Sequence, residues 1–476
     1  MEITVAPDRI KATIKCSPEQ MIEVKKLLSY KEKVFEGRKR VSTLDGSRMV
    51  QKFKTVTKVA MKGNTILAGL VPRVVEGFRE GVCKVSLTNP LTDDQLGLHH
   101  PIQHLGDIHL RDYQKEAVQR VVEKRRGLIV FPTGSGKTVM MAAVIASYID
   151  CTFVVFVQKV DLLNQTVKNL EKMLGEKVGC VGAGKSDWQP VTVCTIQSFL
   201  SGGYALPWVD GIIVDEVHHA GSPSYRKALT RIGSEIRVGF TATEAYIPKK
   251  QFQIEGLFGQ TIHTMPYEEL EAEGKLAKGE VHMYEIPINP DVFTMSGSNW
   301  HAVYNHGIVH NPDRNSKITI LARDYRDEGK KVLIIVNKLD HGYLLHGMCG
   351  SESDFVHGST DVEERGKVGE ALRGEGGKIV IATNIFDEGM DFPDLDVVLL
   401  ARGWESPIAT VQSAGRATRV TDSKKNFLVI DFYDRTHKIL KKHSNTRIRT
   451  YKQKGWDVII KAQLDKKPLL LLRSAV

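Results

Sequence analysis

The stretch FPTGSGKT, at residues 131–138, decides how the rest of the chain is interpreted. It follows the apolar run GLIVF (127–131) and opens a helical pattern that reaches Tyr148. A glycine-rich turn between a strand and a helix surrounds phosphate with backbone N–H groups, and the helix N-terminus adds partial positive charge. The stretch therefore predicts a nucleotide-phosphate loop, although Phe131 stands where the strict pattern has glycine.

The residues inside the loop predict which atoms meet the nucleotide. Gly134 and Gly136 permit the backbone to close around phosphate. Lys137 would reach the terminal phosphates, and the Thr138 hydroxyl would bind Mg²⁺. A chance glycine turn is the alternative, and the strand–loop–helix context disfavours it. We expect ATP and Mg²⁺ as cofactors, and the remaining nucleotide contacts predicted in the loop are Thr133 and Ser135.

Apolar runs on both sides of the loop predict the fold class. Strands that are apolar throughout are typical of parallel sheets covered by helices on both faces. One set lies in the first half of the chain and a second set in the other half, so we expect two tandem α/β domains. The runs are TFVVFV (152–157), VTVCTI (191–196), GIIVDE (211–216), KVLIIV (331–336), KIVIAT (378–383), VVLLA (397–401) and FLVIDF (427–432).

The remaining segments have a different character. The first hundred residues mix short strand-like runs with basic turns, and KFKTVTKVAM (52–61) followed by TILAGL (65–70) predicts a hairpin. The expected domains are a small basic α+β DNA-binding domain at 1–100, an ATP-binding α/β domain at 101–265, a connector at 266–315, a second α/β domain at 316–440, and a basic extension at 441–476.

A pair of acids ends one of the predicted strands. In DEVHH (215–219), a carboxylate at the carboxyl end of a parallel strand points toward the ligand crevice. We expect Asp215 to bind Mg²⁺ and Glu216 to orient and deprotonate the attacking water. Alone, such a pair is more often a surface turn, but an upstream phosphate loop in the same sheet favours hydrolysis. His218 and His219 lack a third metal ligand at suitable spacing.

Two arginines in the second half of the chain complete the group of residues expected for nucleotide hydrolysis. QSAGRATR (412–419) places Arg416 and Arg419 about one helical turn apart. Guanidinium groups aimed at one point suit the charge on a transferring phosphoryl group, although such a pair alone is usually solvated. With the loop on the first domain, they predict ATP bound between two domains that hydrolysis opens.

Charge and cysteine content limit the classes of partner. The net charge of +10 and the acid-free stretch 437–454 favour a polyanion, as does the basic segment 31–40; solvated faces are the alternative. The six scattered cysteines form no C-x-x-C pair, which disfavours zinc and iron–sulfur sites and fits a reducing cytoplasm. No apolar run approaches a membrane span. We expect a cytoplasmic, nucleoid-associated protein, in the host cytoplasm if it is viral, with no membrane partner.

The ordered motifs resemble those of the superfamily 2 helicases of the DExH type, over about residues 105–435. The resemblance implies two RecA-like motor domains and an ATP hydrolase coupled to unwinding of nucleic acid. LRDYQ (110–114) is similar to the adenine-recognition element, DEVHH to motif II, and GFTATE (239–244) to motif III. ATNIFDEGMDFP (382–393) is similar to motif V and QSAGRATR to motif VI.

Residue roles follow from this resemblance position by position. It implies nucleotide contacts at Arg111, Gln114, Gly389 and Asp391, and catalytic roles at Lys137, Asp215, Glu216, Gln412, Arg416 and Arg419. It implies coupling of hydrolysis to movement at His218, Thr241 and Thr243. FVQKVDLLNQ (156–165) and TIQS (195–198) resemble strand-contact motifs. The implied DNA contacts are Gln158, Lys159, Thr195, Gln197 and Thr383.

The segment GIVHNPDRNSKI (307–318) is similar to one in the XPB-like and UvsW-like branch. The resemblance implies a DNA-dependent ATPase that unwinds or remodels branched or forked DNA in recombination, repair or replication, by branch migration and fork regression. An RNA helicase is an alternative, because phosphate contacts do not identify the sugar. Others are the motor subunit of a restriction-type complex and a scaffold with an inactive ATPase. No protein partner is indicated, and a monomer is the working expectation.

Overall fold

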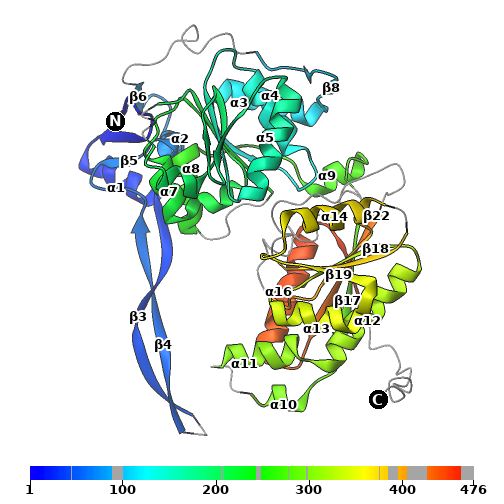
Figure 1. Cartoon of the computed structure of the whole chain (residues 1–476). Helices are drawn as coiled ribbons and strands as arrows, with labels where there is room; N and C mark the ends of the chain where they lie inside the picture. The colour runs from blue at the N-terminus through cyan, green and yellow to red at the C-terminus, as the bar shows by residue number, and fades with distance from the viewer. Residues whose placement is uncertain are drawn as a thin grey trace, which may run out of the picture. The chain divides into compact units, whose positions relative to one another are not determined.

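The computed structural model describes residues 1–43, 46–87, 100–204, 206, 208–242, 248–276, 278–295, 299–374, 376–383, 395–404 and 426–461. The chain divides into two compact units (Figure 1). The first contains Met1–Phe131 and Gly136–Met265, and the second contains Pro132–Ser135 and the chain from Pro266 onward. Within the described ranges, no helix is long and apolar enough to cross a membrane.

The first unit begins with a small α+β module. Its four-stranded sheet has the order β5-β2-β1-β6, and β1 and β2 alternate buried and exposed residues because helices cover one face. Ile3, Ile14 and Val24 lie in the core of the module. Its elements are β1 (Glu2–Val5), β2 (Lys11–Lys15), α1 (Pro18–Leu27), β5 (Thr65–Leu67), η1 (Ala68–Leu70), α2 (Val71–Glu76) and β6 (Lys84–Leu87).

A long two-stranded hairpin extends from this module (Figure 1). It consists of β3 (Ser29–Thr43) and β4 (Gly46–Val59). The predicted hairpin of 52–61 with 65–70 is therefore wrong: β4 pairs with β3, and β5 pairs with β2. The Lys62–Thr65 turn does form, but Ile66 is buried in the core of the module, so β5 joins the four-stranded sheet.

The module packs against the α/β domain of the same unit. Arg9 is buried and its Nε lies 2.8 Å from Glu235 Oε2, while Arg126 Nη1 donates to the Arg9 carbonyl oxygen at 2.8 Å. A Cβ added to Gly69 would lie 2.1 Å from the carbonyl oxygen of Glu255, so backbone approaches backbone there. The module and the α/β domain therefore form one folding body.

The α/β domain of the first unit has an eight-stranded sheet in the order β12-β11-β13-β10-β14-β15-β9-β16. Its ladders are parallel except for β11 with β12. The strands are β9 (Arg126–Val130), β10 (Phe153–Val157), β11 (Gly179–Gly182), β12 (Lys185–Asp187), β13 (Val191–Thr195), β14 (Gly211–Val214), β15 (Ile236–Thr241) and β16 (Thr261–Thr264). A short ladder, β7 (His104–Leu105) with β8 (Ile108–His109), precedes them.

Helices connect these parallel strands and cover the sheet. They are α3 (Asp112–Lys124), α4 (Lys137–Ala146), α5 (Val160–Leu174), α6 (Ile196–Ser201), η3 (Val217–Gly221), α7 (Pro223–Leu229) and α8 (Pro248–Phe258). The central strands β10, β13, β14 and β15 are buried along their whole length, which explains their unbroken apolar sequence.

The second unit has a seven-stranded sheet in the order β19-β20-β18-β21-β22-β17-β23, with all its described ladders parallel. Its strands are β17 (Lys278–Ile286), β18 (Lys331–Ile335), β19 (Ser353–Val356), β20 (Lys378–Ala382), β21 (Val397–Leu400), β22 (Asn426–Asp434) and β23 (Asp457–Lys461). Its helices include α9 (Tyr267–Ala272), α10 (Pro290–Phe293), α11 (Trp300–Tyr304), α12 (Pro312–Asp327), α13 (Leu339–Cys349), α14 (Val362–Arg373) and α16 (Lys438–Gln453). The expected pair of parallel α/β domains behind a small α+β module is confirmed.

Two strands of this sheet come from segments expected to lie outside it. β17 belongs to the stretch 266–315, and β23 to the stretch 441–476, yet the two strands pair with each other. We therefore propose domain limits of about 278–461 for the second α/β domain in place of 316–440.

Candidate active site

The phosphate loop connects β9 to α4. Gly134 and Gly136 have φ angles of 87° and 84°, in the left-handed region that favours glycine. A Cβ on Gly136 would lie 2.5 Å from Gln114 Nε2, so a side chain there would displace Gln114. The structure thus gives a conformational reason for both glycines and a steric one for Gly136. Thr133 and Ser135 lie in the same loop, and Thr138 lies in the first turn of α4.

Phe131, the departure from the strict loop pattern, is fully buried. Its ring centroid lies 5.7 Å from that of Tyr113 and 5.2 Å from that of His263. Its backbone N–H donates to the Thr241 carbonyl oxygen at 2.9 Å. The side chain therefore fills the core beneath the loop, which is why glycine is dispensable at this position.

Two side chains make polar contacts in and beside the loop. Lys137 Nζ donates to the Phe131 carbonyl oxygen at 3.3 Å, across the loop. Gln114 is buried, and its Oε1 accepts from the Arg111 backbone N–H at 3.0 Å. Arg111 in turn donates from Nη1 to the Tyr113 hydroxyl at 3.0 Å. The sequence-predicted adenine readers thus lie at the start of α3, directly beside Gly136.

Asp215 and Glu216 follow β14, two strands from β9 in the sheet. Glu216 has a φ of 50°, a left-handed conformation that is uncommon for a residue with a side chain. Its backbone N–H donates to Asp215 Oδ1 at 2.9 Å. This turn brings the two carboxyl groups together at the carboxyl edge of the sheet. Strained backbone of this kind is concentrated at functional sites.

The two carboxyl groups titrate differently. Burial raises the pKa of Asp215 to about 6, and the charge of Glu216 adds to that shift while Lys137 opposes it. Burial alone would also raise the pKa of Glu216, but a hydrogen bond from His218 and the charges of Lys137, His218 and His219 lower it to about 2. Glu216 is therefore the member of the pair that stays ionised to lower pH. A carboxylate of such low basicity serves first to orient a water molecule.

His218 connects this pair to the next strand. Its Nδ1 lies 3.0 Å from Thr241 Oγ1 and 3.3 Å from Glu216 Oε2. Both His218 and Thr241 are buried. Because Thr241 ends β15 and shares a backbone hydrogen bond with Phe131, one contiguous set of residues joins the loop, the acids and β15.

The candidate strand contacts lie along the same sheet edge. Gln158 and Lys159 follow β10, and Gln197 follows β13, two neighbouring parallel strands whose carboxyl ends coincide with that of β14. Thr195 is buried and caps α6, because its Oγ1 accepts from the Ser198 backbone N–H at 3.2 Å. Gln197 is exposed, so it is better placed than Thr195 to meet a strand.

Of the remaining predicted residues, the structure describes Thr383, in the second unit. Thr383 follows β20, and its backbone N–H donates to the Val356 carbonyl oxygen at 3.3 Å. Thr243, Gly389, Asp391, Gln412, Arg416 and Arg419 lie outside the described residues. Within the described part of the chain, no group of three His, Cys, Asp or Glu residues has the arrangement of a metal site.

Sequence reasoning missed a buried charge network in the second unit. Arg314 is fully buried, with Nε 2.9 Å from Asp434 Oδ1 and its guanidinium over the Phe432 ring. Arg447 Nε lies 2.7 Å from Asp431 Oδ2 and is also buried. Arg447 comes from the acid-free stretch 437–454, and its burial removes it from the expected phosphate-binding surface. Aspartates inside the apolar run FLVIDFYD (427–434) were the available signal.

The residues present fit a nucleotide with its magnesium ion. Gly136 leaves a cradle that a side chain would fill, and Lys137, Thr138 and Asp215 provide the donor set that phosphate and a hard divalent cation prefer. Burial and the charge of Glu216 raise the pKa of Asp215, and the nearby Lys137 opposes this shift.

Family models match both α/β domains. Residues 107–245 match the family described as "Type III restriction enzyme, res subunit", and residues 316–421 match "Helicase conserved C-terminal domain". The chain belongs to the superfamily 2 helicases. It is accordingly an ATP-dependent helicase by family, with XPB-like relatives.

Individual proteins are also similar to this chain. A "DNA 3'-5' translocase XPB2" from Sulfurisphaera tokodaii is 25% identical over 67% of this chain and 80% of its own. The crystal structure of T4 UvsW covers 97% of this chain and 99% of that chain at 17% identity, with a TM-score of 0.36. Saccharomyces cerevisiae Dbp5 bound to RNA and ADP BeF3 covers 78% of this chain and 95% of that chain, at 17% identity and a TM-score of 0.55. The similarity to Dbp5 shows that this chain has the same RecA-like fold.

Proposed function

We propose that the chain is an ATP-driven DNA helicase or translocase that remodels branched or forked DNA. One observation carries the proposal: the phosphate loop, the Asp215–Glu216 pair and the His218–Thr241 contact share a sheet edge with the exposed Gln197. Nucleotide chemistry and strand contact would thus act on adjacent strands of one sheet. Such proximity suits an enzyme that converts hydrolysis into movement along a strand.

The described side chains divide the chemical work. Lys137 and the loop N–H groups would bind the β- and γ-phosphates, and Gln114 would read the base beside Gly136. A magnesium ion held through Thr138 and Asp215 would neutralise phosphate charge when bound. Glu216 would orient the attacking water. His218 contacts both Glu216 and Thr241, so it would transmit the state of the nucleotide site to Thr241. Gln412, Arg416 and Arg419 would contribute from the second domain.

DNA is the proposed strand for two reasons. A relative of which 80% aligns with this chain is named a DNA 3'-5' translocase. The net charge of +10 favours a polyanion as partner. Phosphate contacts by Gln158, Lys159, Gln197 and Thr383 would not by themselves distinguish RNA. We further propose a monomer located in the cytoplasm with the nucleoid, or in the host cytoplasm if the protein is viral.

The decisive experiment measures ATP turnover with single-stranded DNA, duplex DNA, forks, four-way junctions and RNA in parallel. The proposal expects the greatest stimulation by forks and junctions, and none by any substrate in the Lys137→Ala variant. Preferential stimulation by RNA would favour an RNA helicase. Turnover by Lys137→Ala equal to that of the parent would overturn the assignment of the phosphate loop.

A further inference from the structure

Two phenylalanines lie exposed on the hairpin, far from any apolar core. Phe35 and Phe53 are 52% and 53% exposed, and their ring centroids lie 5.8 Å apart at an interplanar angle of 69°. They are paired directly across β3 and β4, so both side chains stand on the same face. Large apolar side chains are usually buried, so two adjacent exposed rings point to a binding role.

Positive charge surrounds this aromatic pair. Lys31 and Lys33 are exposed and lie on the same face as Phe35, toward the root of the hairpin. Lys54, next to Phe53 in sequence, is also exposed, but it stands on the other face of the hairpin and lies 3.6 Å from Glu36. The hairpin sequence 29–59 contains nine Lys and Arg residues against three Asp and Glu residues. This excess of positive charge complements a phosphate backbone. It does not suit an apolar membrane surface or a protein surface without acidic residues.

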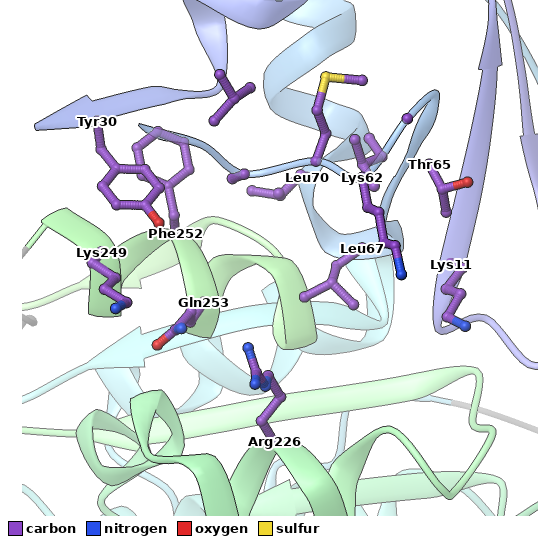
Figure 2. A pocket seen from close by; sticks show the side chains of 15 residues that line it. Lys11, Tyr30, Lys62, Thr65, Leu67, Leu70, Arg226, Lys249, Phe252 and Gln253 are labelled. Atoms are coloured by element: carbon purple, nitrogen blue, oxygen red, sulfur yellow. The ribbon is translucent and has the colours of Figure 1, made fainter. Parts of the chain in front are cut away.

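The root of the hairpin is fixed to the motor domain by α8. The Tyr30 and Phe252 ring centroids lie 5.6 Å apart, and Lys249 Nζ lies 2.6 Å from Glu32 Oε1. Figure 2 shows Tyr30, Phe252 and Lys249 together at one end of a pocket of about 790 Å³. Because α8 is the first helix after β15, which ends at Thr241, force on the hairpin would be borne by the ATPase domain.

We propose that the Phe35–Phe53 pair stacks on the terminal base pair of duplex DNA at a junction and separates its strands. This role rests on the proposed DNA helicase function. Every base has a π-face, so aromatic rings stack on bases without regard to sequence. Lys31 and Lys33 would hold the adjoining backbone, and the anchored root would keep the rings fixed while the motor moves DNA against them.

A structural role for the rings must be separated from this one. A two-stranded hairpin is only marginally stable, and a cross-strand aromatic pair stabilises it. The double variant Phe35→Val/Phe53→Val keeps strand-forming residues and an apolar contact but removes the rings. The double variant Phe35→Trp/Phe53→Trp keeps rings. Val56→Ala, opposite Glu32 on the other face, serves as the matched control.

The test compares fork unwinding with ATP turnover on single-stranded DNA for these four proteins. We expect the valine pair to unwind forks about tenfold more slowly with unchanged turnover, and the tryptophan pair and Val56→Ala to match the parent. In the absence of ATP, 2-aminopurine at the junction should be quenched by the parent and the tryptophan pair, and not by the valine pair.

Two outcomes would overturn the proposed stacking role of the Phe35–Phe53 pair. The first is that the valine pair unwinds forks and quenches 2-aminopurine at parental levels. The second is that the tryptophan pair loses as much unwinding and quenching as the valine pair. A parental dimer in sedimentation that the valine pair abolishes would instead assign the rings to a second copy of the chain. A parent that no DNA stimulates would contradict the proposed helicase function itself, which the single-strand turnover reports separately.

Discussion

His218 Nδ1 lies 3.0 Å from the Thr241 hydroxyl oxygen and 3.3 Å from Glu216 Oε2. This ring joins the turn after β14 to the end of β15 through buried polar atoms. Buried hydrogen-bonded contacts have few alternative geometries, because breaking one leaves a donor unsatisfied. We therefore propose that a change at the carboxylates is transmitted to β15.

Removing the Thr241 hydroxyl should uncouple hydrolysis from unwinding. We expect Thr241→Val to retain DNA-stimulated ATP turnover while unwinding falls about fivefold, in line with one lost hydrogen bond of about 1 kcal/mol. Turnover and fork unwinding are measured together. Thr192→Val is the matched control, because it removes a buried β13 hydroxyl that donates to the Gln189 carbonyl oxygen away from the site. Equal uncoupling in both variants would refute the role of Thr241.

Lys137→Ala should abolish ATP turnover without unfolding the chain. The Lys137 side chain is partly exposed and contacts a loop carbonyl rather than a core, so its loss removes phosphate binding and little packing. We expect turnover to fall at least about 100-fold while the melting temperature stays unchanged. Lys115→Ala, on the exposed face of α3, should change neither quantity. A large drop in melting temperature would show that Lys137 is structural.

Glu216→Gln should bind ATP but fail to hydrolyse it. The amide keeps the size of the side chain and loses the negative charge that orients water, so turnover should fall about 10²- to 10⁴-fold. Nucleotide affinity, measured with a fluorescent ATP analogue, should remain near that of the parent. Parental turnover would rule out Glu216 as the water-orienting group.

The raised pKa of Asp215 predicts a pH-dependent stability. The folded value of about 6 exceeds the ordinary value of about 3.9, so the folded state binds this proton more tightly. The resulting stabilisation is complete below about pH 4 and is lost as pH rises through about 6. Without nucleotide, Asp215→Asn should be about 1–2 kcal/mol more stable than the parent at pH 8, a gain discounted for partial exposure.

Urea unfolding of the two proteins between pH 4 and pH 8 measures this difference. The gain in unfolding free energy should shrink toward zero at pH 4. Asp150→Asn changes an exposed aspartate and should show no such trend. A gain that is constant across the pH range would mean that titration of Asp215 is not its source.

Arg416→Ala and Arg419→Ala should reduce DNA-stimulated turnover more than ATP binding. Their guanidinium groups are predicted to stabilise charge that develops only during phosphoryl transfer, an effect worth about 10³-fold or more. Comparing kcat with nucleotide affinity separates the two effects. If neither substitution alters kcat, hydrolysis does not need the second domain.

The places of the candidate ATPase residues in the fold could be predicted because their signals are local. Gly134, Gly136 and Lys137 lie in a strand–loop–helix unit, and Asp215 and Glu216 lie at the end of one strand. Parallel order then brings these strand ends to one edge, which the apolar runs already indicate. The burial of Thr195 could not be predicted in this way. Its side chain caps α6, and that contact depends on the path of the chain from β13 into α6.

The sequence by itself determined the two parallel α/β domains and the phosphate loop. Short stretches of sequence suffice for this, because they indicate which strands are buried along their whole length and where a glycine-rich turn forms. Only the tertiary structure decided that β4 pairs with β3 and β17 with β23, since both pairings depend on contacts between distant segments. It also decided that Arg9 docks on Glu235, that Arg447 is buried on Asp431, and that Phe35 and Phe53 stand exposed together. A residue's charge or ring is fixed by the sequence, but the groups that surround it are fixed by packing.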